Sequence, residues 1–255
     1  MRFNAQSSAL AIGMSILSFN SLAFQPLVTD DTGTQGQSGN QLELAGTRAT
    51  DDTSRTGEMA FAYTRGLTDT IDVFVELGRQ GINDGTATKR GPTNPSIGAK
   101  WRFFENERKT SLAIKPIYIV PVSEDNETKG MGTGKASYEV SLIFTQEMGW
   151  GAVHANLVTG RSKYKDLTAN EDSKDGSFSV APVWNLNEQW KLAVDLGLTR
   201  SQTNSATSKV RFGEVGAIYS PNADLDFALG FIRETDRDTK EVTKSTTAGV
   251  TWRFK

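Results

Sequence analysis

Short stretches in which apolar and polar residues alternate recur along most of the chain. In the last of them, Val250 and Trp252 fall on one face of an extended strand. Thr251 and Arg253 fall on the other face, because successive side chains of a strand point to opposite sides. Strands with one apolar, aromatic-tipped face and one polar face suit a wall between lipid and water. The pattern therefore predicts an all-β fold, a transmembrane antiparallel β-barrel.

Twelve such stretches predict an up-and-down barrel of about 12 strands. The strands are expected near 40–48, 57–65, 71–78, 95–103, 110–121, 137–147, 152–160, 177–184, 189–199, 209–219, 225–233 and 244–254. Short connections alternate with longer ones. The longer ones are expected near 49–56, 79–94, 122–136, 161–176, 200–208 and 234–243. Because outer-membrane barrels have short periplasmic turns and longer extracellular loops, both termini are expected in the periplasm.

Two of these strands depart from a simple alternation. Val210 and Phe212 are out of phase with the residues that follow, so a β-bulge is expected near Gly213. The strand at 110–121 contains Pro116, which cannot donate a ladder hydrogen bond, and this region is also expected to be bulged.

The chain divides into three expected parts. Residues 1–23 have the form of a signal peptide, with a basic residue, a short apolar core and small residues before the cleavage site. Residues 24–38 show no alternation, and they form either a periplasmic tail or a plug that folds into the lumen. Residues 39–255 form the barrel domain.

Two acidic pairs, at 30–31 and 51–52, have no spaced calcium-binding motif around them. Solvated acidic turns are therefore the default expectation for both, and no metal site is predicted. If residues near the N-terminus form a plug, the aspartates of the first pair would instead bind Lys100, Arg102 or Arg253.

Composition excludes several classes of protein. The net charge of −2 gives no electrostatic reason to expect a nucleic-acid partner. No run of about eighteen apolar residues occurs, which excludes a helical membrane protein. The chain has no cysteine, so disulfides and thiolate chemistry are excluded as well.

The 5 tryptophans give an independent indication of a membrane. All of them lie beside an expected periplasmic strand end, where aromatic rings gather at the membrane interface. They are Trp101, Trp150, Trp184, Trp190 and Trp252. A soluble β-sandwich, the alternative fold, does not predict this placement.

Inward positions carry polar side chains of both signs in near balance. The candidate lumen-lining residues are Asp72, Glu76, Lys100, Arg102, Lys115, Glu139, His154, Asn156, Lys191, Asp195, Glu214, Asp226 and Arg253. Their charges either set the selectivity of a pore or form ion pairs that fill the barrel. Twelve strands lie between the filled small barrels and the wide porins, so only a narrow path is expected.

Several expected inward positions are apolar instead. They are Phe74, Ile117, Ile119, Ile143, Val158 and Ile232. A path for hydrophobic small molecules would use such residues, and so would contact with a plug.

No catalytic constellation is visible in the sequence. His154 is the only histidine, and no Gly-x-Ser-x-Gly nucleophile motif accompanies it. No catalytic residue, metal or cofactor is predicted, and the protein is not expected to be an enzyme.

The segment after the signal peptide carries a resemblance to a known family. It contains Thr29, Asp30, Asp31, Gly33 and Thr34 in the run Thr-Asp-Asp-x-Gly-Thr. This run resembles the start of mature proteins in the outer-membrane transporter family named for the meta-pathway of phenol degradation.

Two later segments, 63–69 and 96–103, are also similar to that family, and the resemblance spans nearly the whole mature chain. It implies a single-chain barrel with a transport role. One departure is Lys255, which places Phe254 next to last where many such barrels end on an aromatic residue.

The sequence thus predicts a barrel of the bacterial outer membrane that passively transports small molecules, with aromatic or otherwise hydrophobic solutes as one option. The expected partners are outer-membrane lipid, the barrel assembly machinery and a small-molecule solute. Two other functions stay open: a closed structural or adhesion-type barrel without transport activity, and an outer-membrane hydrolase.

Overall fold

The computed structural model describes residues 26–255, so the signal peptide expected over 1–23 lies outside the described residues. Strands make up most of the described chain, and the helix α1 spans Glu124–Thr128. The strands are β1 (Asn40–Thr50), β2 (Arg55–Gly66), β3 (Ile71–Asn83), β4 (Thr88–Pro92), β5 (Ser96–Glu105), β6 (Thr110–Ile119), β7 (Ser137–Met148), β8 (Gly151–Ser162), β9 (Ser173–Asn185), β10 (Trp190–Gln202), β11 (Thr207–Asn222), β12 (Leu225–Asp236) and β13 (Val242–Phe254).

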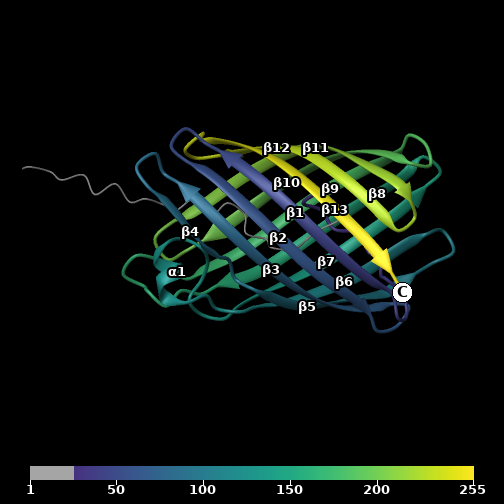
Figure 1. Cartoon of the computed structure of the whole chain (residues 1–255), viewed down its shortest axis with the longest axis horizontal. Helices are drawn as coiled ribbons and strands as arrows, with labels where there is room; N and C mark the ends of the chain where they lie inside the picture. The colour runs from purple at the N-terminus through teal and green to yellow at the C-terminus, as the bar shows by residue number, and fades with distance from the viewer. Residues whose placement is uncertain (1–25) are drawn as a thin grey trace, which may run out of the picture.

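These strands form one antiparallel sheet that closes on itself (Figure 1). β1 pairs with β13 from Asn40 opposite Phe254 to Thr50 opposite Lys244, and its other edge pairs with β2. The short β4 and β5 pair with successive parts of β3, so together they occupy one position in the wall. The protein is therefore a closed antiparallel barrel of 12 strands, as the sequence predicts. Closure pairs both edges of the long strands, and among the described strands only the short β4 has one edge without a partner.

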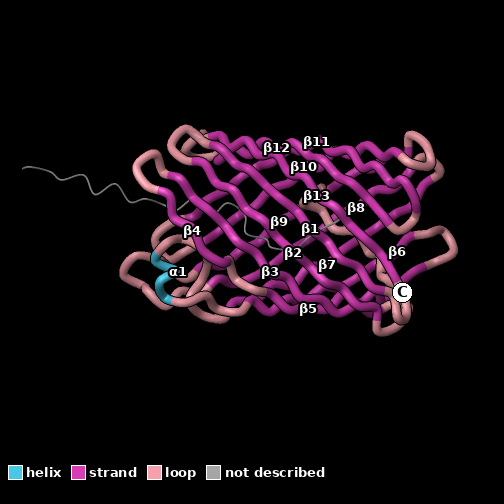
Figure 2. The backbone as a smooth tube through the Cα atoms, viewed as in Figure 1, coloured by secondary structure: helices cyan, strands magenta, loops and turns pink. Residues whose placement is uncertain are grey.

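The connections differ between the two ends of the barrel (Figure 2). Tight turns such as 149–150 and 223–224 lie at the end where the chain terminates, as expected. At the other end most loops are shorter than the sequence indicates, because the polar residues at the strand ends continue the ladder. The loops at 51–54 and 203–206 are examples, and α1 lies in the longer connection that follows β6.

The β-bulge expected near Gly213 is wrong. β11 stays in register there, with Gly213 opposite Leu196 on one side and Arg233 on the other. Phe212 is buried on the inward face, in phase with the residues that follow. Gly197 on β10 makes this possible, because a Cβ at that position would lie 2.3 Å from the Phe212 ring.

The bulge expected in the strand that contains Pro116 is also misplaced. β6 pairs with β7 without interruption, and Pro116 lies opposite Val140. The irregularity lies on the neighbouring β5, between Arg102 and Phe104. Phe103 is the extra residue, and both it and Phe104 are exposed on the outer face. A second irregularity follows Tyr219 near the end of β11.

The barrel wall has two faces of opposite character. Large apolar side chains such as Leu44, Phe61 and Leu196 are exposed on the outside, while inward positions are buried and mostly polar. An apolar exterior around a polar interior is the arrangement of a membrane-spanning barrel. Among the described residues, no helix is long and apolar enough to cross a membrane.

All the tryptophans lie near the end with the tight turns, and several pair with a second aromatic ring. Trp150 and Trp184 stack with ring centroids 5.7 Å apart, and the Trp190 centroid lies 4.8 Å from that of Tyr219. Trp252 is half exposed. Their contact with a membrane interface stays a prediction.

Candidate functional site

The interior of the barrel holds residues 26–39, which we call the N-terminal segment. Thr29 anchors it to two strands and is fully buried. The Thr29 backbone N–H donates to Asp195 Oδ2 on β10 at 2.7 Å, and its hydroxyl donates to Asp195 Oδ1 at 2.7 Å. The same hydroxyl lies 2.7 Å from Ser179 Oγ on β9. Three short polar contacts therefore hold Thr29 against the wall at β9 and β10.

Asp30 binds two lysines of the barrel wall. Its Oδ2 lies 2.9 Å from Lys115 Nζ on β6, and its Oδ1 lies 3.2 Å from Lys100 Nζ on β5. The Asn156 amide on β8 lies between the backbone N–H and carbonyl of Asp30, at 2.7 and 2.9 Å when its nitrogen faces the carbonyl. Burial raises the pKa of Asp30, but the two ammonium groups outweigh burial and lower it from 3.8 to about 2.

The segment continues across the lumen through further polar contacts. The Thr32 N–H donates to Thr145 Oγ1 at 3.1 Å, and the Thr32 hydroxyl lies 2.5 Å from Ser111 Oγ. The Gln35 N–H then donates to the Asp72 carboxylate on β3 at 3.0 Å. In the order of strands around the barrel, β3 and β10 lie on opposite sides. The segment therefore spans the lumen.

Glycines and a small apolar contact complete the fit of the segment. At its end, Gly36 approaches Gly66 of β2 so closely that a Cβ on Gly66 would lie 1.8 Å from the Gly36 carbonyl oxygen. At its start, Leu27 is buried against Ala181, Val183 and Ala193. The lack of a side chain at Gly66 and the apolar contacts of Leu27 both favour this path of the segment.

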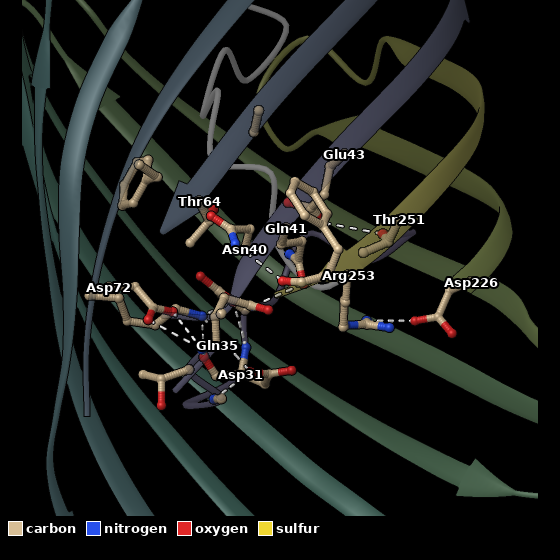
Figure 3. Close-up of a pocket in the computed structure, with 18 of the residues that line it drawn as sticks. Asp31, Gln35, Asn40, Gln41, Glu43, Thr64, Asp72, Asp226, Thr251 and Arg253 are labelled. Atoms are coloured by element: carbon tan, nitrogen blue, oxygen red, sulfur yellow. Dashed lines mark hydrogen bonds and ion pairs between the residues drawn. The ribbon is translucent and has the colours of Figure 1, made fainter. Parts of the chain in front are cut away.

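A polar cavity of about 610 Å³ lies between the N-terminal segment and the wall formed by β1, β2, β3 and β13. Figure 3 shows Gln35 and Asp72 on one side of it and Arg253 with Asp226 on the other. Thr251 Oγ1 donates to Glu43 Oε1 at 3.4 Å. Glu43 is a buried inward carboxyl that is not among the residues predicted to line the lumen, although it lies on the same strand face as Ala45.

The structure places the candidate lumen residues on inward positions. Those that are buried are Asp72, Glu76, Lys115, Glu139, His154, Asn156, Asp195 and Glu214. Those that are partly exposed are Lys100, Arg102, Lys191, Asp226 and Arg253. Their role in selectivity stays a prediction.

The apolar inward positions divide in the same way. Phe74, Ile117 and Ile143 are buried, whereas Ile119, Val158 and Ile232 are partly exposed. Phe212 and Ile218 are also buried. The change of phase expected within β11 hid the inward position of Phe212, whereas Ile218 shares the inward face with Glu214 and could have been predicted.

The expected partners of the aspartates are right for Lys100 and wrong for the two arginines. Arg253 binds Asp226 on the neighbouring strand at 2.6 Å. Arg102 lies 3.4 Å from Glu105 and donates to the Asp69 carbonyl at 3.1 Å. Both arginines thus have partners near their own strand ends.

The two acidic pairs have different surroundings. Asp51 accepts hydrogen bonds from the backbone N–H groups of Thr53 and Ser54, as a capped acidic turn does. Asp30 contradicts the expectation of a solvated turn, because it is buried and bound to lysines. The described residues include no group of three or more potential metal ligands.

His154 belongs to the network that holds the N-terminal segment. Its Nδ1 lies 2.9 Å from Thr145 Oγ1, the oxygen that accepts from the Thr32 N–H. The Thr145 hydroxyl beside His154 therefore already binds the N-terminal segment, and His154 forms a packing contact in this network.

Comparison with solved structures finds the same fold at low identity. An outer membrane channel from Pseudomonas putida F1, of the group COG4313, matches with a TM-score of 0.68 at 11% identity, covering 88% of this chain and 98% of that chain. The NanC porin matches with a TM-score of 0.57 at 9% identity, covering 83% and 98%. The β domain of the Bordetella autotransporter BrkA matches with a TM-score of 0.54 at 10% identity, covering 85% and 99%. These likenesses establish the outer-membrane barrel fold.

A search of curated proteins finds no match. A protein-family model matches residues 23–254, nearly the whole chain. Its description is "Putative MetA-pathway of phenol degradation", the family that the Thr-Asp-Asp-x-Gly-Thr run resembles. The chain belongs to this family of outer-membrane β-barrels.

Proposed function

We propose that this protein is a passive channel of the bacterial outer membrane for small solutes, and that the N-terminal segment is its plug. The barrel fold, the polar lumen and the channel among its structural relatives support the first part. The contacts of Thr29, Asp30 and Gln35 support the second, because they tie the segment to strands on opposite sides of the lumen.

The lining around Asp30 favours small aromatic or otherwise hydrophobic acids as solutes. Lys115 Nζ lies 2.9 Å from Asp30 and 4.9 Å from the centroid of the Phe74 ring. Ile117 is buried one inward position further along β6. If Asp30 moves away, a solute carboxylate can take its place on the lysines while its ring packs against Phe74. A cation beside an aromatic face also attracts a ring electrostatically.

The observation that carries the proposal is the carboxylate of Asp30 held between Lys100 and Lys115. The chain itself thus occupies the lysines that we assign to the carboxylate of a solute. Charge-assisted hydrogen bonds of this kind are strong but reversible, so another anion can compete for them.

Conductance in a planar bilayer tests the proposal. The refolded mature chain should conduct, and benzoate added in millimolar amounts should increase the current because it competes with Asp30 for the lysines and releases the plug. Cyclohexylamine, a cation of similar size, should leave the current unchanged. A folded barrel that is silent both as the natural chain and as Asp30→Asn would contradict a channel and favour the closed structural barrel.

A further inference from the structure

The outer face of the barrel becomes basic near the end opposite the tight turns, which we expect to be extracellular. Outward positions lower on the wall carry large apolar side chains such as Val215 and Phe231. On β8 to β13 and on β1 to β3, every acidic side chain of these strands lies at an inward position. The outward positions of the same strand ends carry arginine and lysine.

Basic residues lie directly opposite one another across three strand pairs. Arg233 of β12 is the register partner of Lys244 of β13. Arg200 of β10 is opposite Lys209 of β11, and Arg161 of β8 is opposite Lys174 of β9. Like charges directly opposite on one face destabilise a sheet. The outer wall therefore carries positive charge that an anion from outside the chain would neutralise.

The height of this basic region fits the headgroups of a membrane leaflet. Lys244 lies on the same strand and face as Trp252, which we expect at the opposite membrane interface. A rise of ~3.4 Å per residue from 244 to 252 on a strand tilted by ~40° gives about 20 Å along the barrel axis. That separation is close to the ~25 Å apolar band of outer-membrane barrels.

Within the basic region the outer wall is hollowed into a groove of about 780 Å³. Four cationic side chains line it, and they come from four consecutive strands, β12, β13, β1 and β2, which lie side by side in Figure 1. They are Arg233, Lys244, Arg48 and Arg55. Val215 and Phe231 form its apolar side. No salt bridge joins any of the four cations to an acidic side chain among residues 26–255.

We propose that this groove binds a phosphorylated glycolipid of the outer leaflet, lipopolysaccharide. Its phosphates would lie against the four cations, and an acyl chain would lie along Val215 and Phe231. The cations extend over three strand spacings of ~4.8 Å, or about 14 Å, so a headgroup with two separated phosphates can contact all of them. A phospholipid with a single phosphate cannot.

The test uses the purified full-length mature barrel in detergent and bisphosphorylated, hexa-acylated lipid A as the probe. Native mass spectrometry should detect a barrel–lipid A complex. The variant Arg233→Gln/Lys244→Gln should bind about 30-fold more weakly, which corresponds to ~1 kcal/mol for each lost basic side chain. The matched control Arg108→Gln/Lys109→Gln removes the same charge from a tight turn at the opposite end and should bind as the natural chain does.

Stability gives a second readout that a merely structural role would not produce. Without lipid A, the Arg233→Gln/Lys244→Gln barrel should unfold at a higher temperature than the natural chain, because the like-charge pair is gone. With lipid A the order should reverse. Equal affinity of the two barrels for lipid A would overturn the proposal. So would equal binding of phosphatidylglycerol, which would show a general preference for anionic lipid, or full competition by inorganic phosphate at the same concentration.

Discussion

Asp30 is the residue on which the position of the N-terminal segment most depends. It contacts Lys100, Lys115 and Asn156, which belong to three different strands. The substitution Asp30→Asn removes the carboxylate that binds both Lys100 and the buried Lys115, and loss of one partner of a buried pair costs about 3–5 kcal/mol. We expect the segment to detach far more often, which hydrogen exchange at residues 26–37 would measure as a loss of protection.

Asp31 provides the matched control for this prediction. It is adjacent in sequence, but its carboxylate is more exposed and lies 3.9 Å from Lys100. Asp31→Asn should therefore change protection much less than Asp30→Asn. Equal effects of the two substitutions would show that net charge, and not the specific pair, holds the segment.

The lowered pKa of Asp30 predicts how docking of the segment depends on pH. A carboxyl whose pKa falls from 3.8 to about 2 on docking binds its proton less readily in the docked state. Its contribution to docking is therefore complete above about pH 4 and is lost as pH falls toward 2. The rise in conductance that depends on Asp30 should therefore occur below about pH 4. Asp30→Asn should lack this rise, and an Asp30-dependent rise centred near pH 6 would contradict the assignment.

Single-residue features could be predicted from the sequence only where the period of two applies. The alternation of apolar and polar residues predicts that Asp195 and Lys115 lie at inward positions. It could not show that Lys115 binds Asp30, because that contact depends on how a segment without periodicity crosses the lumen. Arg253 was expected to bind the same segment, yet a nearer carboxylate on the adjacent strand takes it.

At the level of strands, β10 and β11 depend on one glycine. Gly197→Ala would place a Cβ 2.3 Å from the Phe212 ring and 2.9 Å from the Phe178 carbonyl oxygen. Overpacking of this kind costs about 1–3 kcal/mol, so the barrel should unfold at a lower urea concentration. A tryptophan fluorescence titration would measure the shift. Phe212→Leu should recover part of the loss.

Gly213 offers the control on the neighbouring strand. A Cβ there would meet only the Leu196 side chain at 3.4 Å, so Gly213→Ala should leave stability nearly unchanged. If both alanine substitutions cost the same, the penalty would come from the glycine backbone and not from Phe212. The wrong expectation of a bulge near Gly213 has the same origin, since sequence phase alone does not show that Gly197 makes room for an inward ring.

For the whole molecule, closure of the barrel is the part that sequence predicts best. Every expected strand has a counterpart, because each one spans the same membrane and repeats the same alternation. Loop lengths are predicted less well, since polar strand ends such as those flanking 203–206 pair beyond the apolar band. The path of the N-terminal segment depends on tertiary contacts that the sequence does not reveal. A plug in the lumen and a tail in the periplasm are both compatible with its residues.

The central claim is that the N-terminal segment partly obstructs a channel. The most direct test compares single-channel conductance of the mature barrel with that of a variant lacking residues 26–37, both shown to be folded by their heat-modifiable gel mobility. We predict a larger, steady conductance in the deletion variant, which a synthetic peptide of residues 26–37 added on the periplasmic side reduces. Unchanged conductance together with unchanged stability would contradict the claim.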